Sequence, residues 1–511
     1  MSAHFSPHSE VPSAGQMPPD AREFVPPAPS SAISIDDATG YKTQADQILS
    51  LAQSAALFHT PDQTGYADIL VCGHRETWPV RSKNFRSWLV NRFFESTGKA
   101  ASSDALQTSI NTIDARALLG EVERAVFVRV GGCEGRIYLD LCDKAWRAIE
   151  IDQTGWRIAD RPPIRFRRAA NMSPLPIPVT GSSIDRLREF LHLKNDDDFV
   201  LAVAWLLGAL REVGPYPLLV LSGEQGGGKS FCSTVLRALI DPNTVPLRSL
   251  PRETRDLFVS ASKNHVLAFD NLSGVAPWLS DSLCRLSTGG GFATRALRTD
   301  TDEITLTAMR PIILNGIDNI VTRPDLADRA LFLTLSAIPE VERRAEAGLW
   351  ARFDQARAPI FGALLDGIVA ALQNLPATKL DCLPRLADFA LWVSAAETAF
   401  WKKGTFAAAF RRNRAAAIDE TIDADPVASG VRKLMSGTPE WHGTASELAS
   451  TLAMLGCERS ATMSRNLSPI VTAGKLRRVA TFLRAIGIET AFTREGRSRT
   501  RMIHITLAET A

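Results

Sequence analysis

Cysteine and histidine are scarce in this 511-residue chain, which contains seven and eight of them respectively. The cysteines include no C-x-x-C pair and the histidines show no metal-ligand spacing, so the sequence disfavours both a structural zinc site and a disulfide framework. Scattered, unpaired cysteines are typical of a reducing compartment, and we expect the protein to be cytoplasmic.

Long apolar runs and a targeting segment are also missing. The longest apolar run, Phe199 to Leu210, is too short to span a bilayer and predicts a buried helix. The N-terminus lacks a basic region followed by an apolar core, so no signal peptide is indicated. The sequence therefore predicts no membrane partner.

Neither sign of charge is in excess, because 58 Lys and Arg face 56 Asp and Glu and leave a net charge of +2. Any attraction for nucleic acid must then come from a local patch. With 45% hydrophobic and 22% charged residues, the chain can bury several cores. Its length suits a soluble globular protein of about three or four domains.

The chain divides into five predicted segments with an overall α/β fold. Strands and helices alternate in the central segment, which predicts a parallel sheet with helices on both faces. The first segment holds seven prolines among Ser and Ala, and we expect it to be disordered because it has little apolar surface to bury. The segments are a proline-rich arm (1–35), an N-terminal α+β domain with a strand meander (36–172), the alternating core with its preceding helices (180–340), a helical region (341–425) and a C-terminal domain (426–511).

The N-terminal domain is predicted to hold two helices and a meander. No strand there carries the paired carboxylates with which a primase holds metal, so a fused polymerising domain is not expected. Four arginines, Arg161, Arg165, Arg167 and Arg168, either contact a phosphate backbone or form a solvated charged face, and the second is favoured. The predicted helices are 87–97 and 103–119, and the predicted strands are 125–130, 136–141, 146–151 and 164–167.

The most informative stretch is Gly223-Glu224-Gln225-Gly226-Gly227-Gly228-Lys229-Ser230, which follows an apolar run and precedes a helix-like run that begins at Phe231. In the pattern G-x-x-x-x-G-K-[ST], glycines let backbone N–H groups surround a phosphate, the lysine reaches the β and γ phosphates, and the hydroxyl binds Mg²⁺. The positive end of the following helix favours the same anion. We therefore predict a site for ATP and Mg²⁺ at residues 223–231, with a glycine-rich turn or an inactive remnant as the alternative.

A buried-strand pattern downstream of Lys229 ends at Asp270. We predict that Ser230 and Asp270 hold the Mg²⁺, the alternative being an aspartate that only caps the strand. Asn271 follows where many ATPases have a glutamate, and an asparagine can orient water but cannot take up a proton. Slow hydrolysis, or a base supplied by Glu224 or Asp281, therefore stays open.

A later strand ends at Asn315, which we predict to bond the γ-phosphate or the attacking water. Arg329 precedes another strand and is our preferred arginine finger, a side chain that enters the site of a neighbouring subunit. Arg323 is the second candidate, and a surface arginine paired with Asp325 or Asp328 is the alternative. The predicted catalytic set is Lys229, Asp270, Asn271, Asn315 and Arg329.

A glycine-rich loop and a hairpin lie between the Asp270 strand and the Asn315 strand. In this order of motifs the chain resembles the superfamily 3 helicases, a branch of the AAA+ ATPases. The run from Asp270-Asn271-Leu272-Ser273 to Asn315-Gly316-Ile317 more narrowly resembles bacterial mobile-element and prophage ATP-binding proteins related to poxvirus-type primase-helicases. The resemblance implies an AAA+ P-loop core, a homo-oligomeric, hexameric ring, and DNA contacts from Arg295 and Arg298 in the pore, although Asp300 and Asp302 would repel phosphate.

The C-terminal domain is predicted to be a winged helix. A capping box at Thr444 and Glu447 opens one helix, a second helix covers about residues 468–486, and strands 488–492 and 500–507 form a basic hairpin. Residues 426–511 carry twelve Lys and Arg against six Glu and no Asp, a charge of +6 that suits DNA, with a protein-docking domain as the alternative. The predicted DNA contacts here are Lys475, Arg477, Arg478, Arg494, Arg497 and Arg499.

Together these features predict an ATPase that couples ATP hydrolysis to translocation on, or unwinding of, single-stranded or forked DNA in mobile-element replication. Two other functions fit nearly the same residues. One is an ATP-dependent switch that binds DNA or a partner in regulation or defence, and the other is a loader for a different helicase.

Overall fold

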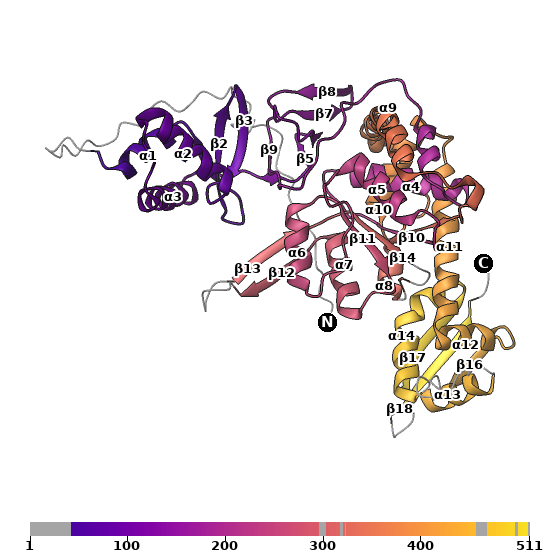
Figure 1. Cartoon of the computed structure of the whole chain (residues 1–511). Coiled ribbons are helices and arrows are strands. Elements are labelled where there is room, and N and C mark those ends of the chain that lie inside the picture. The colour runs from indigo at the N-terminus through magenta and orange to yellow at the C-terminus, as the bar shows by residue number, and fades with distance from the viewer. Residues whose placement is uncertain are drawn as a thin grey trace. The chain divides into compact units, whose positions relative to one another are not determined.

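The computed structural model describes residues 42–295, 303–316, 320–321, 323–455, 468–495 and 499–508 (Figure 1). The chain forms two compact units. One runs to Phe127 and includes Asp160–Arg167, and the other comprises Val128–Ala159 and the chain from Arg168 onward. This division differs from the predicted boundary near residue 172, because most of the meander belongs to the second unit.

The first unit packs three helices against a small antiparallel sheet. Serine side chains begin two of the helices, since Ser82 accepts from the N–H of Phe85 and Ser102 accepts from the N–H of Ala105. The strand order is β1-β2-β3, and a short parallel pair, β4 and β9, is added. The elements are α1 (Gln44–Ala52), β1 (Ala56–His59), β2 (Gly65–Val71), β3 (His74–Pro79), α2 (Lys83–Thr97), α3 (Ser103–Leu118), β4 (Val126–Phe127) and β9 (Arg165–Phe166).

The second unit begins with a four-stranded antiparallel meander in the order β5-β6-β7-β8. Its strands are β5 (Val130–Cys133), β6 (Arg136–Asp140), β7 (Ala148–Asp152) and β8 (Gly155–Ala159). β8 has no counterpart among the predicted strands, and the first and last predicted strands correspond to β4 and β9, which pair with each other in the first unit instead of joining the meander.

Two of the four arginines singled out in the sequence lie in internal ion pairs. In the first unit, Arg165 is buried and its Nε donates to Asp68 at 2.8 Å. In the second unit, Arg168 donates to Asp140 at 2.5 Å and its guanidinium lies 4.0 Å from the centre of the Trp146 ring. The interpretation of these two residues as a phosphate contact or a solvated face was therefore wrong.

A parallel four-stranded sheet forms the centre of the second unit, which confirms the predicted α/β fold. The strands are β10 (Leu218–Gly223), β11 (Leu267–Leu272), β14 (Ile312–Gly316) and β15 (Ala330–Leu335), in the order β11-β14-β10-β15. Alternate residues of a strand point to opposite faces. Leu219 and Leu221 face one hydrophobic cluster with α4, α5 and α9, whereas Leu218 and Val220 face another with α6 and α7.

The helices around this sheet are η2 (Ile184–Phe190), α4 (Asp196–Ala209), α5 (Lys229–Ile240), α6 (Thr254–Lys263), α7 (Pro277–Thr288) and α8 (Pro324–Ala327). Asn195 caps α4 by accepting from the N–H of Asp198, so α4 is a separate helix and not a continuation of η2. Strands β12 (Gly290–Arg295) and β13 (Glu303–Ala308) lie between β11 and β14 in the sequence. They form an antiparallel hairpin that projects away from the central sheet (Figure 1).

Helices dominate the chain after the sheet. They are η3 (Glu340–Glu342), α9 (Glu346–Asn374), η4 (Leu375–Ala377), α10 (Ala387–Ala396), η5 (Glu397–Ala399) and α11 (Thr405–Ala424). The helical stretch Glu346–Ala377 is long and apolar enough to cross a membrane by length and composition alone, yet half of its most apolar window is buried. Phe353, Phe361 and Leu365 of this stretch lie in the main hydrophobic core.

Residues 426–508 form the C-terminal module, which follows α11 (Figure 1). Its elements are α12 (Pro426–Met435), β16 (Glu440–Gly443), α13 (Ala445–Met454), α14 (Pro469–Ala485), β17 (Ile488–Glu495) and β18 (Thr500–Leu507), with an antiparallel sheet in the order β16-β18-β17. The predicted capping box is present, because Thr444 accepts from the N–H of Glu447 and Glu447 accepts from the N–H of Thr444. On α14, Leu476, Val479 and Leu483 are buried at helical spacing, and Ile486, just after the helix, is half-buried.

Candidate nucleotide site

A glycine-built loop joins β10 to α5. Gly226 and Gly228 adopt positive φ values of 84° and 77°, and Gly228 is the residue from which α5 begins. A Cβ at Gly223, where φ is 141°, would lie 2.6 Å from the carbonyl oxygen of Leu335. Side chains at these positions would be strained or would collide with β15. The loop therefore keeps its backbone close to the start of a twelve-residue helix, whose free N–H groups suit an anion.

The residues predicted to hold phosphate and metal come together at this loop. Lys229 Nζ donates to the carbonyl oxygens of Gly223 and Glu224 at 2.7 and 2.8 Å. Ser230 Oγ donates to Asp270 Oδ1 at 3.1 Å, although the two residues are forty positions apart in the sequence. A hydroxyl and a carboxylate oxygen at this spacing are hard ligands of the kind that Mg²⁺ prefers.

Asn315 connects the neighbouring strands to α5 from a buried position. The backbone N–H of Asn271 donates to Asn315 Oδ1 at 3.2 Å, which fixes the orientation of the amide because its nitrogen cannot accept. Asn315 Nδ2 in turn donates to Ser233 Oγ at 2.8 Å. Asn315 is 1% exposed, so it is a rigid link between β14, β11 and the helix that follows the loop.

Asn271 lies at a local irregularity of β11. The register with β14 shifts between Phe269 and Leu272, and Asn271 has a φ of 60°. Asparagine tolerates this left-handed conformation better than most residues. Its side chain is exposed, and its backbone N–H also donates to Asp270 Oδ1 at 2.8 Å. At this irregularity the backbone N–H of Asn271 therefore fixes the orientation of the preceding Asp270 carboxylate.

The remaining loop residues differ in their surroundings. Glu224 and Gln225 are exposed, and Gly227 is buried. Phe231 packs edge-on against Trp350, with ring centres 5.0 Å apart. Burial raises the pKa of the Cys232 thiol to about 12, so this cysteine stays protonated and acts as a packing residue.

Two features of the site were missed in the sequence. Ser233 lies one turn after Lys229 on α5, and that spacing could have pointed to it. The second is the segment after β15, which lies over the loop. A Cβ on Gly227 would be 3.3 Å from the Ser336 carbonyl oxygen, and one on Gly228 would be 3.4 Å from Ile338. No sequence pattern marks this segment.

Arg329 lies at the other end of the sheet. The N–H of Leu218, the first residue of β10, donates to the Arg329 carbonyl, whereas the loop follows Gly223 at the end of that strand. Five strand steps of about 3.3 Å separate the two ends by roughly 16 Å. The guanidinium of Arg329 donates to the Asp325 carbonyl oxygen at 2.6 Å and lies 3.7 Å from Cys284 Sγ.

The second finger candidate and one candidate base are paired with each other. Arg323 Nη2 lies 2.9 Å from Asp281 and 3.6 Å from Asp325. Asp281 is therefore held by an arginine. Arg329 also contacts Asp325, but through the backbone carbonyl of that residue. Among the described residues, Arg329 therefore lacks the carboxylate ion pair that was the alternative to a finger.

The predicted DNA contacts fall on three surfaces. Arg298 and Arg497 lie outside the described residues, and only the backbone of Arg295 is described, at the end of β12. On α14, Arg477 and Arg478 are exposed, and the Arg477 guanidinium lies 4.4 Å from the centre of the Phe492 ring. Lys475 is half-buried, with its Nζ 3.8 Å from Asp425. In the hairpin of β17 and β18, Arg494 and Arg499 are exposed.

Two family models match this chain, one over the central sheet and its helices and the other over the C-terminal module. Residues 184–422 match the model of the actinomycete integrative conjugative element replication protein, and residues 427–511 match the model of the C-terminal domain of this replication protein. Together the two matches cover more than half of the chain. The chain belongs to this family of replication proteins. The junction between the matches coincides with the turn from α11 to α12, so the family division and the fold agree.

Among curated proteins, no match was found. Three similar solved structures are apo forms of the NrS-1 C terminal region. The first is 12% identical with a TM-score of 0.40, and the alignment covers 92% of this chain and 100% of that chain. The second, of residues 305–718, is 12% identical with a TM-score of 0.39 and covers 89% and 97%. The third is 11% identical with a TM-score of 0.39 and covers 92% and 100%.

Proposed function

We propose that this mobile-element replication protein is an ATPase of the superfamily 3 type, with an AAA+ P-loop core, that translocates on or unwinds DNA. The observation that carries the proposal is that Lys229, Ser230 and Asp270 meet at a loop in which glycines adopt positive φ values, with Asn315 bonded to the adjacent backbone N–H of Asn271. Lys229 and Ser230 begin α5 directly after the loop that follows β10, whereas Asp270 and Asn315 lie near the carboxyl ends of β11 and β14, the edge of the sheet at which α/β folds bind ligands.

In this proposal Lys229 binds the β and γ phosphates, exchanging the loop carbonyls for phosphate oxygens. Ser230 and Asp270 hold Mg²⁺, which neutralises charge that develops on the phosphates. Asn315 keeps one amide N–H beyond its bond to Ser233, and this donor orients the γ-phosphate or the attacking water.

The base is the weakest part of this site. Asn271 cannot accept the proton from the attacking water, and Asp281 is paired with Arg323 at 2.9 Å. Glu224 remains as an exposed carboxylate within the loop. We therefore expect slow hydrolysis in the isolated subunit.

A ring of subunits would complete the site. Arg329 is roughly 16 Å of strand from the loop of its own subunit, farther than an arginine side chain reaches, so it serves as a finger only toward a neighbour. An arginine supplied in trans stabilises charge in the transition state and accelerates hydrolysis by about 10³ to 10⁵. A hexamer is the assembly that the family resemblance implies.

The C-terminal module, read as a winged helix, supplies a DNA contact surface. Arg494 and Arg501 are partners in the β17–β18 register, and both are exposed. Like charges directly opposite each other destabilise a hairpin, so the pair favours a polyanion as its partner. Arg477 and Arg478 on α14 add to the same charge. Arg501 was not among the sequence candidates, although the hairpin register would have identified it.

The test is ATP hydrolysis by the purified chain with and without single-stranded DNA, in parallel with Lys229→Ala. We expect DNA to stimulate hydrolysis and the substitution to abolish it. Hydrolysis that DNA leaves unchanged, or stimulation that survives Lys229→Ala, would refute the proposal.

A second candidate is an ATP-dependent switch, and Asn271 in place of a glutamate is the observation that favours it. A switch binds ATP and DNA and releases no strand. Displacement of a labelled strand from a forked duplex separates it from a helicase. A loader for another helicase would instead co-purify with that partner.

A further inference from the structure

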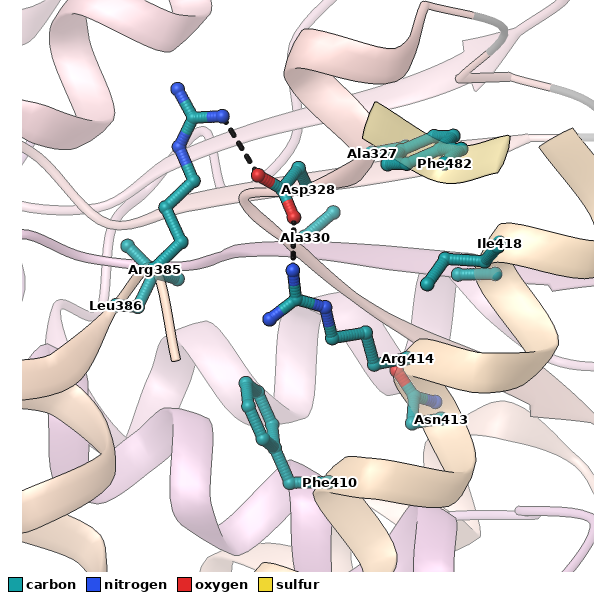
Figure 2. A pocket seen from close by; sticks show the side chains of 11 residues that line it. Ala327, Asp328, Ala330, Arg385, Leu386, Phe410, Asn413, Arg414, Ile418 and Phe482 are labelled. Carbon is teal, nitrogen blue, oxygen red and sulfur yellow. Dashed lines mark hydrogen bonds and ion pairs between the residues drawn. The ribbon is translucent and has the colours of Figure 1, made fainter. Parts of the chain in front are cut away.

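Asp328, the residue before Arg329, is held between two arginines. Arg385 Nη1 donates to Asp328 Oδ2 at 2.7 Å, and Arg414 Nη2 donates to Oδ1 at 2.9 Å (Figure 2). The Asp328 side chain is 7% exposed, whereas the two arginine side chains are 42% and 40% exposed. We call these three residues the Asp328 clamp. A buried carboxylate with one guanidinium on each oxygen has little freedom to move.

Arg414 connects the clamp to α11, a helix that is also bonded to the edge strand of the sheet. Arg414 lies on α11, and its neighbour Asn413 donates to the Phe332 carbonyl at 2.5 Å and accepts from the Phe332 N–H at 3.1 Å. β15 is an edge strand, so Asn413 replaces the partner that the strand lacks at this point. Movement of α11 is therefore transmitted to the strand that follows Arg329.

The short helix before the clamp is built into the C-terminal module. Ala327 of α8 packs in the same buried cluster as Ile418 of α11 and Phe482 of α14. These three side chains line a pocket next to the Asp328 clamp (Figure 2). A shift of α14, the helix that presents Arg477 and Arg478, therefore reaches Asp328 through packed side chains and not through a free linker.

Arg329 itself is incompletely satisfied within its own subunit. Its Nη1 has the Asp325 carbonyl, but its Nε is buried and finds no hydrogen-bond partner among the described residues. A buried donor without a partner has lost its hydrogen bonds to water without gaining others, which destabilises the position that holds it. The Arg329 side chain would therefore gain a hydrogen bond by moving to a better acceptor. A fixed backbone at Arg329 would determine which acceptors the side chain can reach.

We propose that Arg385 and Arg414 are positioning residues that act through Asp328 to hold Arg329 toward a neighbouring subunit's nucleotide, and that this clamp transmits DNA binding at α14 to the finger. The inference rests on the proposed function. It adds a route by which the DNA-contacting module controls hydrolysis at a site that it does not touch.

The first measurement is the steady-state kinetics of Arg414→Gln with and without DNA. Displacement of a catalytic group by about 1 Å costs roughly 10²-fold in rate, so we expect a loss of DNA-stimulated kcat of that order. KM for ATP should change less than about twofold, because Lys229 and the loop are untouched. Arg414→Lys, which restores one donor, should recover part of the rate.

Arg412→Gln is the matched control. Arg412 lies on the same helix and makes an even shorter carboxylate pair, with Asp197 of α4 at 2.5 and 2.7 Å, away from Asp328. This variant should keep the DNA-stimulated rate. Equal losses in Arg412→Gln and Arg414→Gln would overturn the inference, since α11 would then act only as a structural support.

Mixed assemblies distinguish a misplaced finger from a damaged fold. An Arg329→Ala subunit has an intact site without a finger, and a Lys229→Ala subunit has a finger without a working site, so their mixture should regain activity. Lys229→Ala combined with Arg414→Gln should fail to restore the Arg329→Ala subunit. Restoration by this double variant would overturn the clamp alone, whereas no restoration in the first mixture would overturn the finger in trans and the clamp with it.

Discussion

His265 precedes the strand that carries Asp270, and its protonation should weaken the fold in a defined pH range. Its Nε2 donates to the Ala209 carbonyl oxygen at 2.7 Å, and its backbone N–H donates to Asp241. Its Nδ1 is buried and has no hydrogen-bond partner among the described residues. Burial, together with a smaller contribution from the nearby Arg310 guanidinium, lowers the pKa of His265 from 6.5 to about 4.

The sign follows from the two states of the chain. As the pH falls below 6.5, the unfolded chain binds a proton on this imidazole before the folded chain does. The stabilising contribution of neutral His265 is therefore complete above pH 6.5 and is lost as the pH falls from 6.5 to about 4. Each unit of pKa difference is worth about 1.4 kcal/mol, so the loss is about 2 kcal/mol at pH 5 and about 3 kcal/mol at pH 4.

His265→Gln is the comparison, because the glutamine amide can still donate to Ala209 but does not titrate. Since the chain has two units, the free energy of opening is best measured locally, by amide hydrogen exchange in β11. We expect the wild type to lose about 2 kcal/mol relative to His265→Gln between pH 7 and pH 5. A difference between the two proteins that is the same at both pH values would show that His265 is not buried in its neutral form.

Three further predictions concern other residues. Asn315→Ala removes the acceptor for the Asn271 N–H and leaves Ser233 without its donor, so we expect kcat to fall more than ATP affinity and stability to fall by about 1–3 kcal/mol, measured by ATPase kinetics, nucleotide titration and urea unfolding. Arg494→Ala and Arg501→Ala should each weaken DNA binding similarly for all sequences and lower the slope of log affinity against log salt by about one, and an unchanged slope in filter binding would exclude a phosphate contact. Burial raises the pKa of Asp198 to about 6, so the folded chain disfavours the ionised carboxylate. The melting temperature of Asp198→Asn should therefore rise relative to that of the wild type as the pH increases from about 4 to about 6, and the difference should persist above pH 6.

The sequence was sufficient for features in which a local pattern has one physical solution. The glycine spacing before Lys229 requires a backbone with positive φ, and the apolar runs on either side indicate a strand and a helix. The capping box at Thr444 is similarly local, because donor and acceptor are three residues apart. The parallel sheet followed from the alternation of strands and helices, although its order did not.

The failures involve partners that are distant in the sequence. Arg165 and Arg168 looked like a basic run, but Asp68 and Asp140 neutralise them from remote segments. The Asp328 clamp is of the same kind, since Arg385 and Arg414 lie 57 and 86 positions away. A single sequence carries no signal for such pairs, because charge spacing identifies only neighbours on one helix or strand.

The conformation of Asn271 bears on where hydrolysis is controlled. Its φ of 60° lies in a region that costs most L-residues about 1–2 kcal/mol, and the irregularity between Phe269 and Leu272 is what lets its N–H reach both Asp270 and Asn315. A glutamate here would bear this strain, whereas asparagine is well suited to it. The same backbone that orients the Asp270 carboxylate therefore disfavours a glutamate at this position. If the protein is an ATPase, its rate must then depend on groups brought from elsewhere, which places control with Arg329 and with the contacts that hold it.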